Sequence, residues 1–300
     1  MHIISEMNKA AEKATILIEA LPYIRQFRGA FIVVKLGGSA QDNPDFLRRI
    51  FADVDFLSAV GMRPIIVYGG GKRITEAMKK LGKQATFIAG QRVTDRDTLA
   101  VAERTLCNDV GNDLLRLLEE AGGHGILLNG RDHSILRAIP KQLPGEPENA
   151  LGFVGEPVAL FSAPLYEAFT HDPIRIPLIA PIACGCGQDS QTLYNVNGDT
   201  AAAQIARDLS AEKLVFLSDI PGVCRDPKDP HTLISTVTKA DVNDLKEQKV
   251  ISGGMIPKVD ACLFGLEGGV QKEHIVSGEL PHALLLEIFT NTGIGTQLTL

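Results

Sequence analysis

Short apolar segments alternate with amphipathic stretches along most of this 300-residue chain. The apolar segments have the length of buried strands and lie at residues 31–34, 64–68, 125–129, 175–180, 213–218 and 274–277. The amphipathic stretches have the i, i+3, i+4 spacing of helices with one buried face and lie at residues 45–60, 72–82, 95–121, 199–209, 238–248 and 254–267. Strands that alternate with helices form crossover units on a parallel sheet. The alternation therefore predicts a three-layer α/β/α sandwich with a mainly parallel central sheet.

Other segments predict how the chain is divided. Residues 8–27 predict one amphipathic helix, so residues 1–28 are expected to form an N-terminal helical extension that packs on its own lobe or on a second subunit. The Pro-, Gly- and Cys-rich segment 180–191 predicts a seam between an N-terminal lobe at 29–190 and a C-terminal lobe at 191–300. Residues 83–93 and 131–158 predict short strands and hairpins that could cover one edge of the sheet.

The composition excludes several classes of protein. Thirty Lys and Arg residues against 36 Asp and Glu residues give a net charge of −6, which is unlike a nucleic-acid or membrane-surface binder. The five cysteines form no CxxC pair, which argues against a disulfide framework and against a zinc site, so no protein-held metal is expected. No apolar run of about 18 residues is present, and a cytoplasmic protein is therefore expected.

Groups of glycines follow two of the predicted strands, in Lys35-Leu-Gly-Gly-Ser39 and in Tyr68-Gly-Gly-Gly-Lys72. Ligands of an open parallel sheet bind beyond the carboxyl ends of its strands, and glycines before a helix let the backbone approach a phosphate group. The alternative is that these glycines only form tight turns between strand and helix. Neither the P-loop pattern GxxxxGK[ST] nor the dinucleotide pattern GxGxxG is present, which disfavours both of those nucleotide-binding classes.

Charged residues stand beside glycines at two further places. Lys35 ends an apolar strand, and Lys258 follows the pair Gly253-Gly254 at the start of a predicted helix. Each ammonium group could face a phosphate, or its side chain could extend along the surface into solvent. Asp199 opens another predicted helix, where it could cap that helix or orient the lysines.

Seven motifs, in this order, resemble the amino acid kinase family: KLGGS, YGGGK, GQRVTD, GFVGEPV, NVNGDTAA, LSDIPGV and SGGMIPK. The resemblance extends from about residue 15 to residue 298 and is to the branch that phosphorylates the side-chain carboxylate of N-acetyl-L-glutamate in arginine synthesis. It implies that the N-terminal lobe binds the acylamino acid and that the C-terminal lobe binds ATP. It also implies that Mg²⁺ is bound mainly by the phosphates of ATP. A side-chain carboxylate is already ionised at neutral pH, so positioning and charge neutralisation would supply the catalysis.

The resemblance also assigns roles to individual residues. Lys35 and Lys258 would neutralise the transferring phosphoryl group, and Asp199 would hold both lysines in place. The residues expected to contact the acylamino acid or to donate backbone N–H groups are Gly38, Gly70, Gly71, Arg92 and Asn195. The residues expected beside the nucleotide are Ser218, Asp219 and Gly222.

Both ends of the chain resemble the arginine-inhibited branch of that family. The segment 19–29, EALPYIRQFRG, resembles a helix that interlaces dimers into a hexameric ring. The tail that begins at His282 resembles an arginine site, in which His282, Glu287 and the backbone near Gly293 would contact the effector. The resemblance therefore implies feedback inhibition by L-arginine and a homo-oligomer, at least a dimer and a hexamer where the helix docks between subunits.

Several positions depart from the family pattern. Tyr68 stands where His is usual, Lys72-Arg73 replaces Pro-Gln, Gly198 replaces Ala, and Asn129-Gly-Arg-Asp132 stands where Gly-Lys-Asp is common. Most of these positions border the acylamino-acid side. A sister kinase acting on another acylated amino acid, such as an aminoadipate derivative, is therefore one alternative. A catalytically silent arginine-sensing subunit is another, which the presence of both lysines and Asp199 disfavours.

Overall fold

The fold is built on an eight-stranded sheet in a computed structural model that describes residues 2–38, 41, 43–290 and 293–300. Along the sheet the strands are β12 (Thr236–Thr238), β14 (Thr296–Thr299), β13 (Lys272–Ser277), β11 (Lys213–Ser218), β1 (Phe31–Leu36), β2 (Arg63–Tyr68), β8 (Ile176–Ile179) and β5 (Gly125–Leu128). All neighbours are parallel except β13 and β14. All six predicted strands are confirmed, and β12 and β14 are short additions at one edge.

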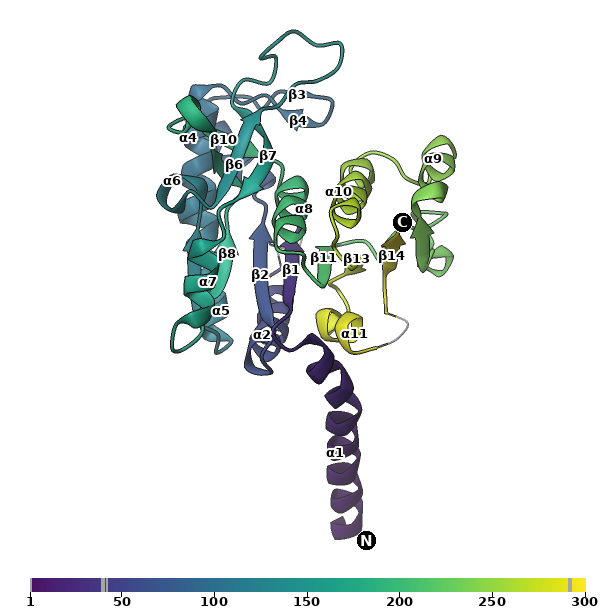
Figure 1. Cartoon of the computed structure of the whole chain (residues 1–300). Coiled ribbons are helices and arrows are strands. Elements are labelled where there is room, and N and C mark those ends of the chain that lie inside the picture. Colours follow the sequence, from purple (N-terminus) through teal and green to yellow (C-terminus); the bar gives the residue numbers. More distant parts are fainter. Residues whose placement is uncertain (1, 39–40, 42, 291–292) are drawn as a thin grey trace.

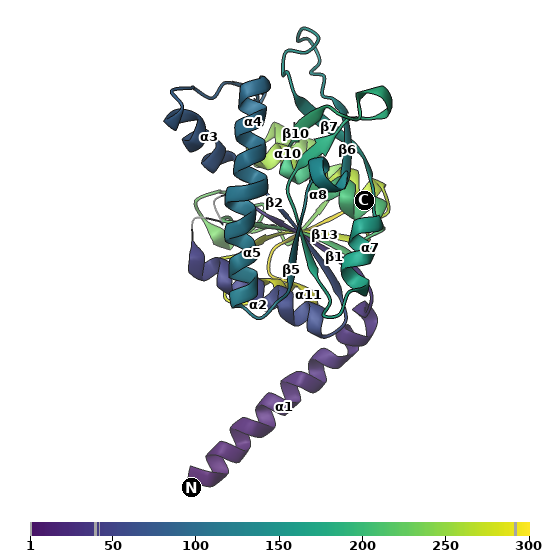
Figure 2. The same ribbon diagram turned by 90° about the vertical axis from the view of Figure 1, so that its left-hand side faces the viewer.

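The central strands are apolar throughout because helices cover both faces of the sheet. Along β1, Val33 packs into one hydrophobic core, while Ile32 and Val34 pack into another on the opposite face. The first core contains α7 (Ala163–Thr170), α8 (Gly198–Asp208), α9 (Lys239–Glu247) and α10 (Met255–Glu267). The second contains α2 (Pro44–Ala59), α3 (Gly71–Lys80), α4 (Arg96–Arg104), α5 (Gly111–Glu120) and α11 (Ala283–Phe289). Figure 2 shows α5 and α7 on opposite sides of the sheet, so the three-layer prediction is confirmed.

The predicted helix at 95–121 contains an irregular section. Residues Thr105–Val110 form a π-helical segment between α4 and α5. The short helix α6 (Gly130–His133) was also not predicted, since only strands and hairpins were expected there. A π-helical segment inside an α-helix is uncommon and is frequently found at functional sites.

A small barrel lies beyond the carboxyl ends of the central strands (Figure 1). It consists of β6 (Leu136–Pro140), β7 (Val154–Leu160), β9 (Ile182–Cys184) and β10 (Leu193–Val196). A hairpin of β3 (Phe87–Ile88) and β4 (Gln91–Arg92) lies beside it. The segment 180–191 contains β9 and a 3₁₀ turn, and β10 pairs back with β7 and β9. The main sheet is continuous through β1 and β11, and the division into lobes stays a prediction.

The first helix, α1 (His2–Phe27), projects away from the body of the molecule in both views (Figures 1 and 2). Its last residues are anchored, because Phe27 is buried and Tyr23 packs edge-on against Phe289 of α11. Ile16, Leu17 and Ile18 leave between 64% and 68% of their surface exposed. The predicted helical extension is therefore present. Within the described part of the chain, no helix combines the length and the apolar character that crossing a membrane requires.

Candidate active site

Two buried lysines, one on the central sheet and one on a helix, contact the same carboxylate. Nζ of Lys35, from β1, lies 2.7 Å from Oδ1 of Asp199, and Nζ of Lys258, from α10, lies 3.4 Å from the same oxygen. Each of the three side chains is only 10% exposed. Asp199 does not cap α8, because Asn197 does so by accepting from the N–H groups of Asp199 and Thr200. The Asp199 carboxylate is therefore available to orient both lysines.

Burial and the charges of this group shift the pKa values of Asp199 and Lys258. Burial alone would raise the pKa of Asp199, but the charges of Lys35 and Lys258 bring this pKa below its usual value. Burial and the charge of Lys35 lower the pKa of Lys258, against the opposing effect of Asp199. Two ammonium groups against one carboxylate leave a net positive charge in a buried place. Such a charge is costly without a partner, so the group favours an anion beside it.

The acylamino-acid residues that the sequence predicts line one cavity of about 480 Å³ together with Lys35 and Asp199. They are Gly38, Gly70, Gly71, Arg92 and Asn195. Gly70 and Gly71 stand at the N-terminus of α3, where the first N–H groups lack intrahelical partners and favour an anion. Ser39 of the first glycine motif lies outside the described residues. The structure thus brings five residues from four separate segments into one cavity beside the lysine–aspartate group.

Arg92 is a buried cation that lines this cavity. Its Nη2 donates to the carbonyl oxygen of Gly71 and to the hydroxyl of Thr75, both at 2.8 Å. The guanidinium also lies 4.8 Å from the ring centre of Phe87. Burial lowers its pKa, and its charge has no counterion among the residues that the structure describes. A guanidinium held in this way can offer its remaining N–H groups and its charge to a ligand carboxylate.

Asn195 is the polar side chain that β10 contributes to the same cavity. Its Nδ2 donates to Oγ1 of Thr94 at 3.3 Å, which fixes the orientation of the amide. The carboxamide oxygen remains as an acceptor for a donor on a ligand, such as an amide N–H group.

The residues predicted beside the nucleotide line a second cavity of about 360 Å³ at the carboxyl end of β11. They are Ser218, Asp219 and Gly222, and Lys258 lines this cavity as well. Position 222 has φ +146°, and a Cβ atom there would lie 2.5 Å from Oγ1 of Thr296, so only glycine fits the turn. The two cavities therefore meet at the lysine–aspartate group, with Lys35 on one side and Lys258 on the other.

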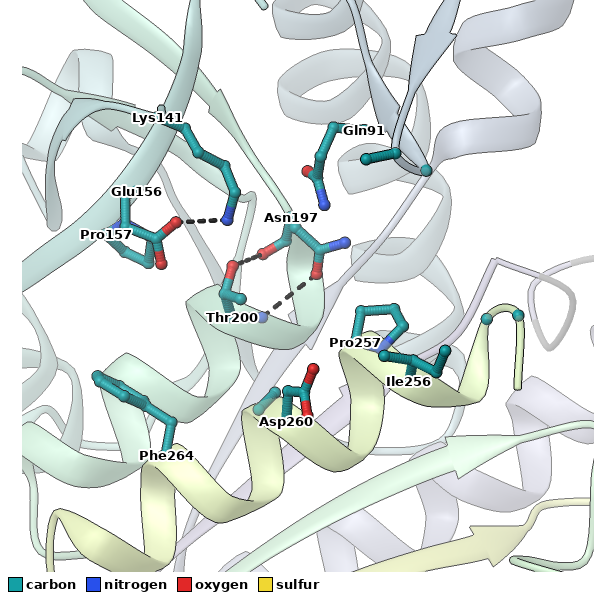
Figure 3. A pocket seen from close by; sticks show the side chains of 15 residues that line it. Gln91, Lys141, Glu156, Pro157, Asn197, Thr200, Ile256, Pro257, Asp260 and Phe264 are labelled. Atoms are coloured by element: carbon teal, nitrogen blue, oxygen red, sulfur yellow. Dashed lines mark hydrogen bonds and ion pairs between the residues drawn. The ribbon is translucent and has the colours of Figure 1, made fainter. Parts of the chain in front are cut away.

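A third cavity of about 660 Å³ lies between the barrel and α10 (Figure 3). It shares Gln91 and Asn197 with the first cavity and Gly254 with the second, so the three cavities are neighbours. The charged groups on its walls are paired, Lys141 with Glu156 and Asp260 with Lys246. No sequence pattern predicted this cavity, because its walls come from elements that lie far apart along the chain.

The C-terminal tail is arranged only partly as predicted. Glu287 and Gly293 line a small cavity of about 30 Å³, but His282 does not. Nδ1 of His282 instead lies 2.6 Å from Oδ1 of Asp53 in α2. His282 stands just before α11, and its side chain faces α2. The tail residues Asn291 and Thr292 lie outside the described residues.

Two residues that the sequence reasoning did not single out join Glu287 at this cavity. Nε2 of His274 lies 3.1 Å from Oε1 of Glu287, and Nζ of Lys213 donates to the carbonyl oxygen of Glu287 at 2.9 Å. Burial lowers the pKa of Lys213 to about 8 and, with the charges of Lys213 and Lys272, lowers that of His274 to about 3. The sequence signal for His274 and Lys213 was a polar side chain within an otherwise apolar strand, and this signal is weak.

Comparisons with known proteins find similar sequences along nearly the whole chain. The family model described as "Amino acid kinase family" matches residues 30–277. The acetylglutamate kinase of Heliobacterium modesticaldum is 43% identical over 97% of this chain and 99% of its own length. That of Moorella thermoacetica is also 43% identical, over 95% of this chain and 97% of its own.

Solved structures are similar as well. N-acetylglutamate synthase from Neisseria gonorrhoeae, solved with coenzyme A and L-arginine, is 27% identical with a TM-score of 0.75, over 93% of this chain and 63% of that one. Carbamate kinase from Giardia lamblia bound to AMP-PNP has a TM-score of 0.64 over 90% of this chain and 98% of that one. At 14% identity, it shows a shared fold.

Proposed function

This chain belongs to the amino acid kinase family, and from that premise we propose that it transfers the γ-phosphoryl group of ATP to the side-chain carboxylate of N-acetyl-L-glutamate. The observation that carries the proposal is the pair of lysines on one carboxylate, placed where two cavities meet. Relatives that are 43% identical over nearly their whole length and are named acetylglutamate kinase support the choice of substrate. The product would be N-acetyl-L-glutamyl 5-phosphate, an intermediate of arginine biosynthesis.

The first cavity offers a place for each part of the acylamino acid. Arg92, whose charge has no counterion among the described residues, would hold the α-carboxylate. The amide oxygen of Asn195 would accept from the N–H group of the substrate. With both ends fixed, the side-chain carboxylate would extend toward Lys35. It is ionised at neutral pH and can attack without a general base, since its pKa is about 4.3.

ATP would occupy the second cavity, with its γ-phosphoryl group at the lysines. A carboxylate oxygen would form a bond to the γ-phosphorus while the bond from that phosphorus to the β,γ-bridging oxygen breaks, and ADP would leave. The chief obstacle is repulsion between two anions, and Lys35, Lys258 and the N–H groups at the start of α3 would offset it. Asp199 would keep the two ammonium groups in place between turnovers.

Magnesium would enter this site with the nucleotide. Within the described part of the chain, no three His, Cys, Asp or Glu side chains gather as a metal-binding cluster. Coordination mainly by nucleotide phosphates and water fits that arrangement, because Mg²⁺ usually keeps several waters and takes few protein ligands. The ion would neutralise part of the phosphate charge, while the chain's own lysines would act on the transferring group.

We also propose that L-arginine inhibits the enzyme at the C-terminal cavity. The buried carboxylate of Glu287, which faces Gly293 and the ring of His274, would receive the guanidinium group of the effector. At about 30 Å³ the cavity would have to widen to admit it. The similar synthase from Neisseria gonorrhoeae, solved with L-arginine, supports the proposal.

The oligomeric state is proposed from α1. Its Ile16, Leu17 and Ile18 are exposed apolar side chains that a second copy of the chain could bury. A homo-oligomer of at least two subunits, and a hexamer where this helix docks between dimers, would follow. The expected cytoplasmic location is consistent with a biosynthetic reaction that uses ATP.

The direct test is acyl-phosphate formation trapped with hydroxylamine in the presence of ATP and Mg²⁺. N-acetyl-L-glutamate should be turned over, and N-acetyl-L-glutamine, which lacks the acceptor carboxylate, should not. Preferential turnover of the homologue with one more methylene would identify a sister kinase instead. No turnover of either carboxylate substrate would contradict the proposed reaction and favour an arginine-sensing role.

A further inference from the structure

The hydroxyl of Tyr68 joins the end of β2 to the π-helical segment Thr105–Val110. It donates to the carbonyl oxygen of Leu106 at 3.1 Å, across 38 residues of sequence. Tyr68 is fully buried, and burial raises its pKa, so the hydroxyl keeps its proton and remains a donor. This hydrogen bond is a tertiary link at the point where the regular helical pattern is broken.

Gly111 shows how closely the hydroxyl is fitted to this segment. Its N–H group donates to the carbonyl oxygen of Leu106, five residues back, as a π-helical turn requires. A Cβ atom at position 111 would lie 2.8 Å from the Tyr68 hydroxyl and 3.1 Å from the Leu106 carbonyl oxygen. The same carbonyl therefore accepts from Gly111 and from Tyr68, and the absence of a side chain at 111 makes room for both.

The side chain of Leu106 extends from this turn to the substrate cavity. Leu106 lines the cavity that contains Arg92 and Asn195. A Cβ atom at Gly70 would lie 2.6 Å from Cδ2 of Leu106, so this methyl group rests directly on the glycine backbone. Gly70 precedes the first residue of α3. The N–H groups that are expected to bind the anion begin at that first residue. The position of Leu106 therefore determines both a wall of the cavity and the space beside these donors.

We propose that Tyr68 is a positioning residue for the acylamino-acid site, because its hydroxyl holds the π-helical turn that presses Leu106 against Gly70. The inference rests on the proposed function. Without the hydroxyl, the Leu106 carbonyl loses a buried donor, and the segment can relax toward an ordinary α-helical turn, which rotates Leu106 out of the cavity. The acylamino acid should then bind less tightly, while the nucleotide cavity, which Leu106 does not line, is unaffected.

Steady-state kinetics of Tyr68→Phe tests this directly, since the substitution removes only the hydroxyl. The KM for N-acetyl-L-glutamate should rise by up to about fivefold, the factor expected if the whole contribution of one hydrogen bond is lost from binding, and the KM for ATP and kcat should not change. Leu106→Ala should raise the same KM. Tyr194→Phe is the matched control, because it removes a hydroxyl that donates to Asp189 from a tyrosine that does not line the cavity.

A second pair of variants tests the same contact from the opposite side. Gly111→Ala should raise the KM for N-acetyl-L-glutamate, because the new methyl group meets the Tyr68 hydroxyl. In a Tyr68→Phe background the same substitution should have a smaller effect, since the hydroxyl is gone. Equal effects in both backgrounds would contradict the proposed link.

The outcomes separate this inference from the proposed function. In one outcome the wild type is active while Tyr68→Phe melts at a lower temperature with both KM values unchanged. That result would overturn the positioning role. Equal increases in both KM values would also overturn it. A wild-type protein that does not phosphorylate N-acetyl-L-glutamate would instead refute the proposed function, and the positioning role would fall with it.

Discussion

Glu273 is an isolated carboxyl group in the core, and its replacement gives a quantitative test of the structure. It lies on β13 with no exposed surface, and neither carboxyl oxygen has an ordinary hydrogen-bond partner among the described residues. The carboxyl group packs on α10 so closely that a Cβ atom at Gly265 would lie 1.9 Å from Oε1. Burial raises the pKa of Glu273 to about 9, against a smaller opposing effect of the Cys262 thiol.

The sign of the pH dependence follows from this pKa. Between pH 4.5 and about 9 the folded chain keeps the proton on Glu273, while the unfolded chain loses it. The contribution of this residue to the free energy of unfolding therefore falls as pH rises, by about 1.4 kcal/mol per pH unit. From pH 5 to pH 7 the expected loss is about 3 kcal/mol, and it is absent in Glu273→Gln, whose side chain is neutral throughout.

Denaturant unfolding of the wild type and Glu273→Gln at pH 5, 6 and 7 measures this difference. The stability of the variant relative to the wild type should increase by about 3 kcal/mol over that range. Comparing the two proteins at each pH cancels the titration of all other groups, and the exposed Glu279→Gln controls for the amide substitution. A difference that does not change with pH would refute the assignment of a buried, protonated carboxyl group.

Three further predictions concern the ligands and the assembly. Arg92→Lys should raise the KM for N-acetyl-L-glutamate at least tenfold with the KM for ATP unchanged, because an ammonium group cannot contact Gly71, Thr75 and the ligand carboxylate together as the guanidinium can; equal changes in both values would contradict the role of Arg92. Titration with L-arginine should suppress turnover of the wild type and act weakly on Glu287→Gln; wild-type activity that arginine leaves unchanged would refute the inhibition. Light scattering should give fewer subunits per particle once residues 1–28 are removed; an unchanged number of subunits would exclude α1 from the assembly.

The sequence predicted the parts of the fold that follow from local periodicity. The central strands are buried on both faces, so their apolar runs stand out, and the glycine motifs locate their carboxyl ends. The cluster of Lys35, Asp199 and Lys258 could be anticipated. In a parallel sheet the carboxyl ends of the strands, and the starts of the helices that follow them, lie at one edge. The roles of these residues stay predictions.

Tertiary contacts determined the remaining features, and a single sequence does not display them. The π-helical segment Thr105–Val110 lies within one continuous amphipathic pattern, and the Tyr68 hydroxyl that supports it comes from another strand. Asp199 was the residue expected as a possible cap for α8, but the side chain of Asn197 caps this helix instead. His282 and His274 both precede Glu287, yet only His274 reaches it, since the turn before α11 directs His282 to α2.

The rate of hydroxylamine-trapped acyl-phosphate formation by Lys258→Met tests most directly whether the lysines on Asp199 stabilise the transferring phosphoryl group. Methionine keeps most of the buried side-chain volume and removes the charge. We expect a folded protein whose kcat is about a hundredfold lower than that of the wild type, with the KM for N-acetyl-L-glutamate little changed. A kcat within about threefold of the wild type would contradict this role of the lysines, because so small a loss is under 1 kcal/mol.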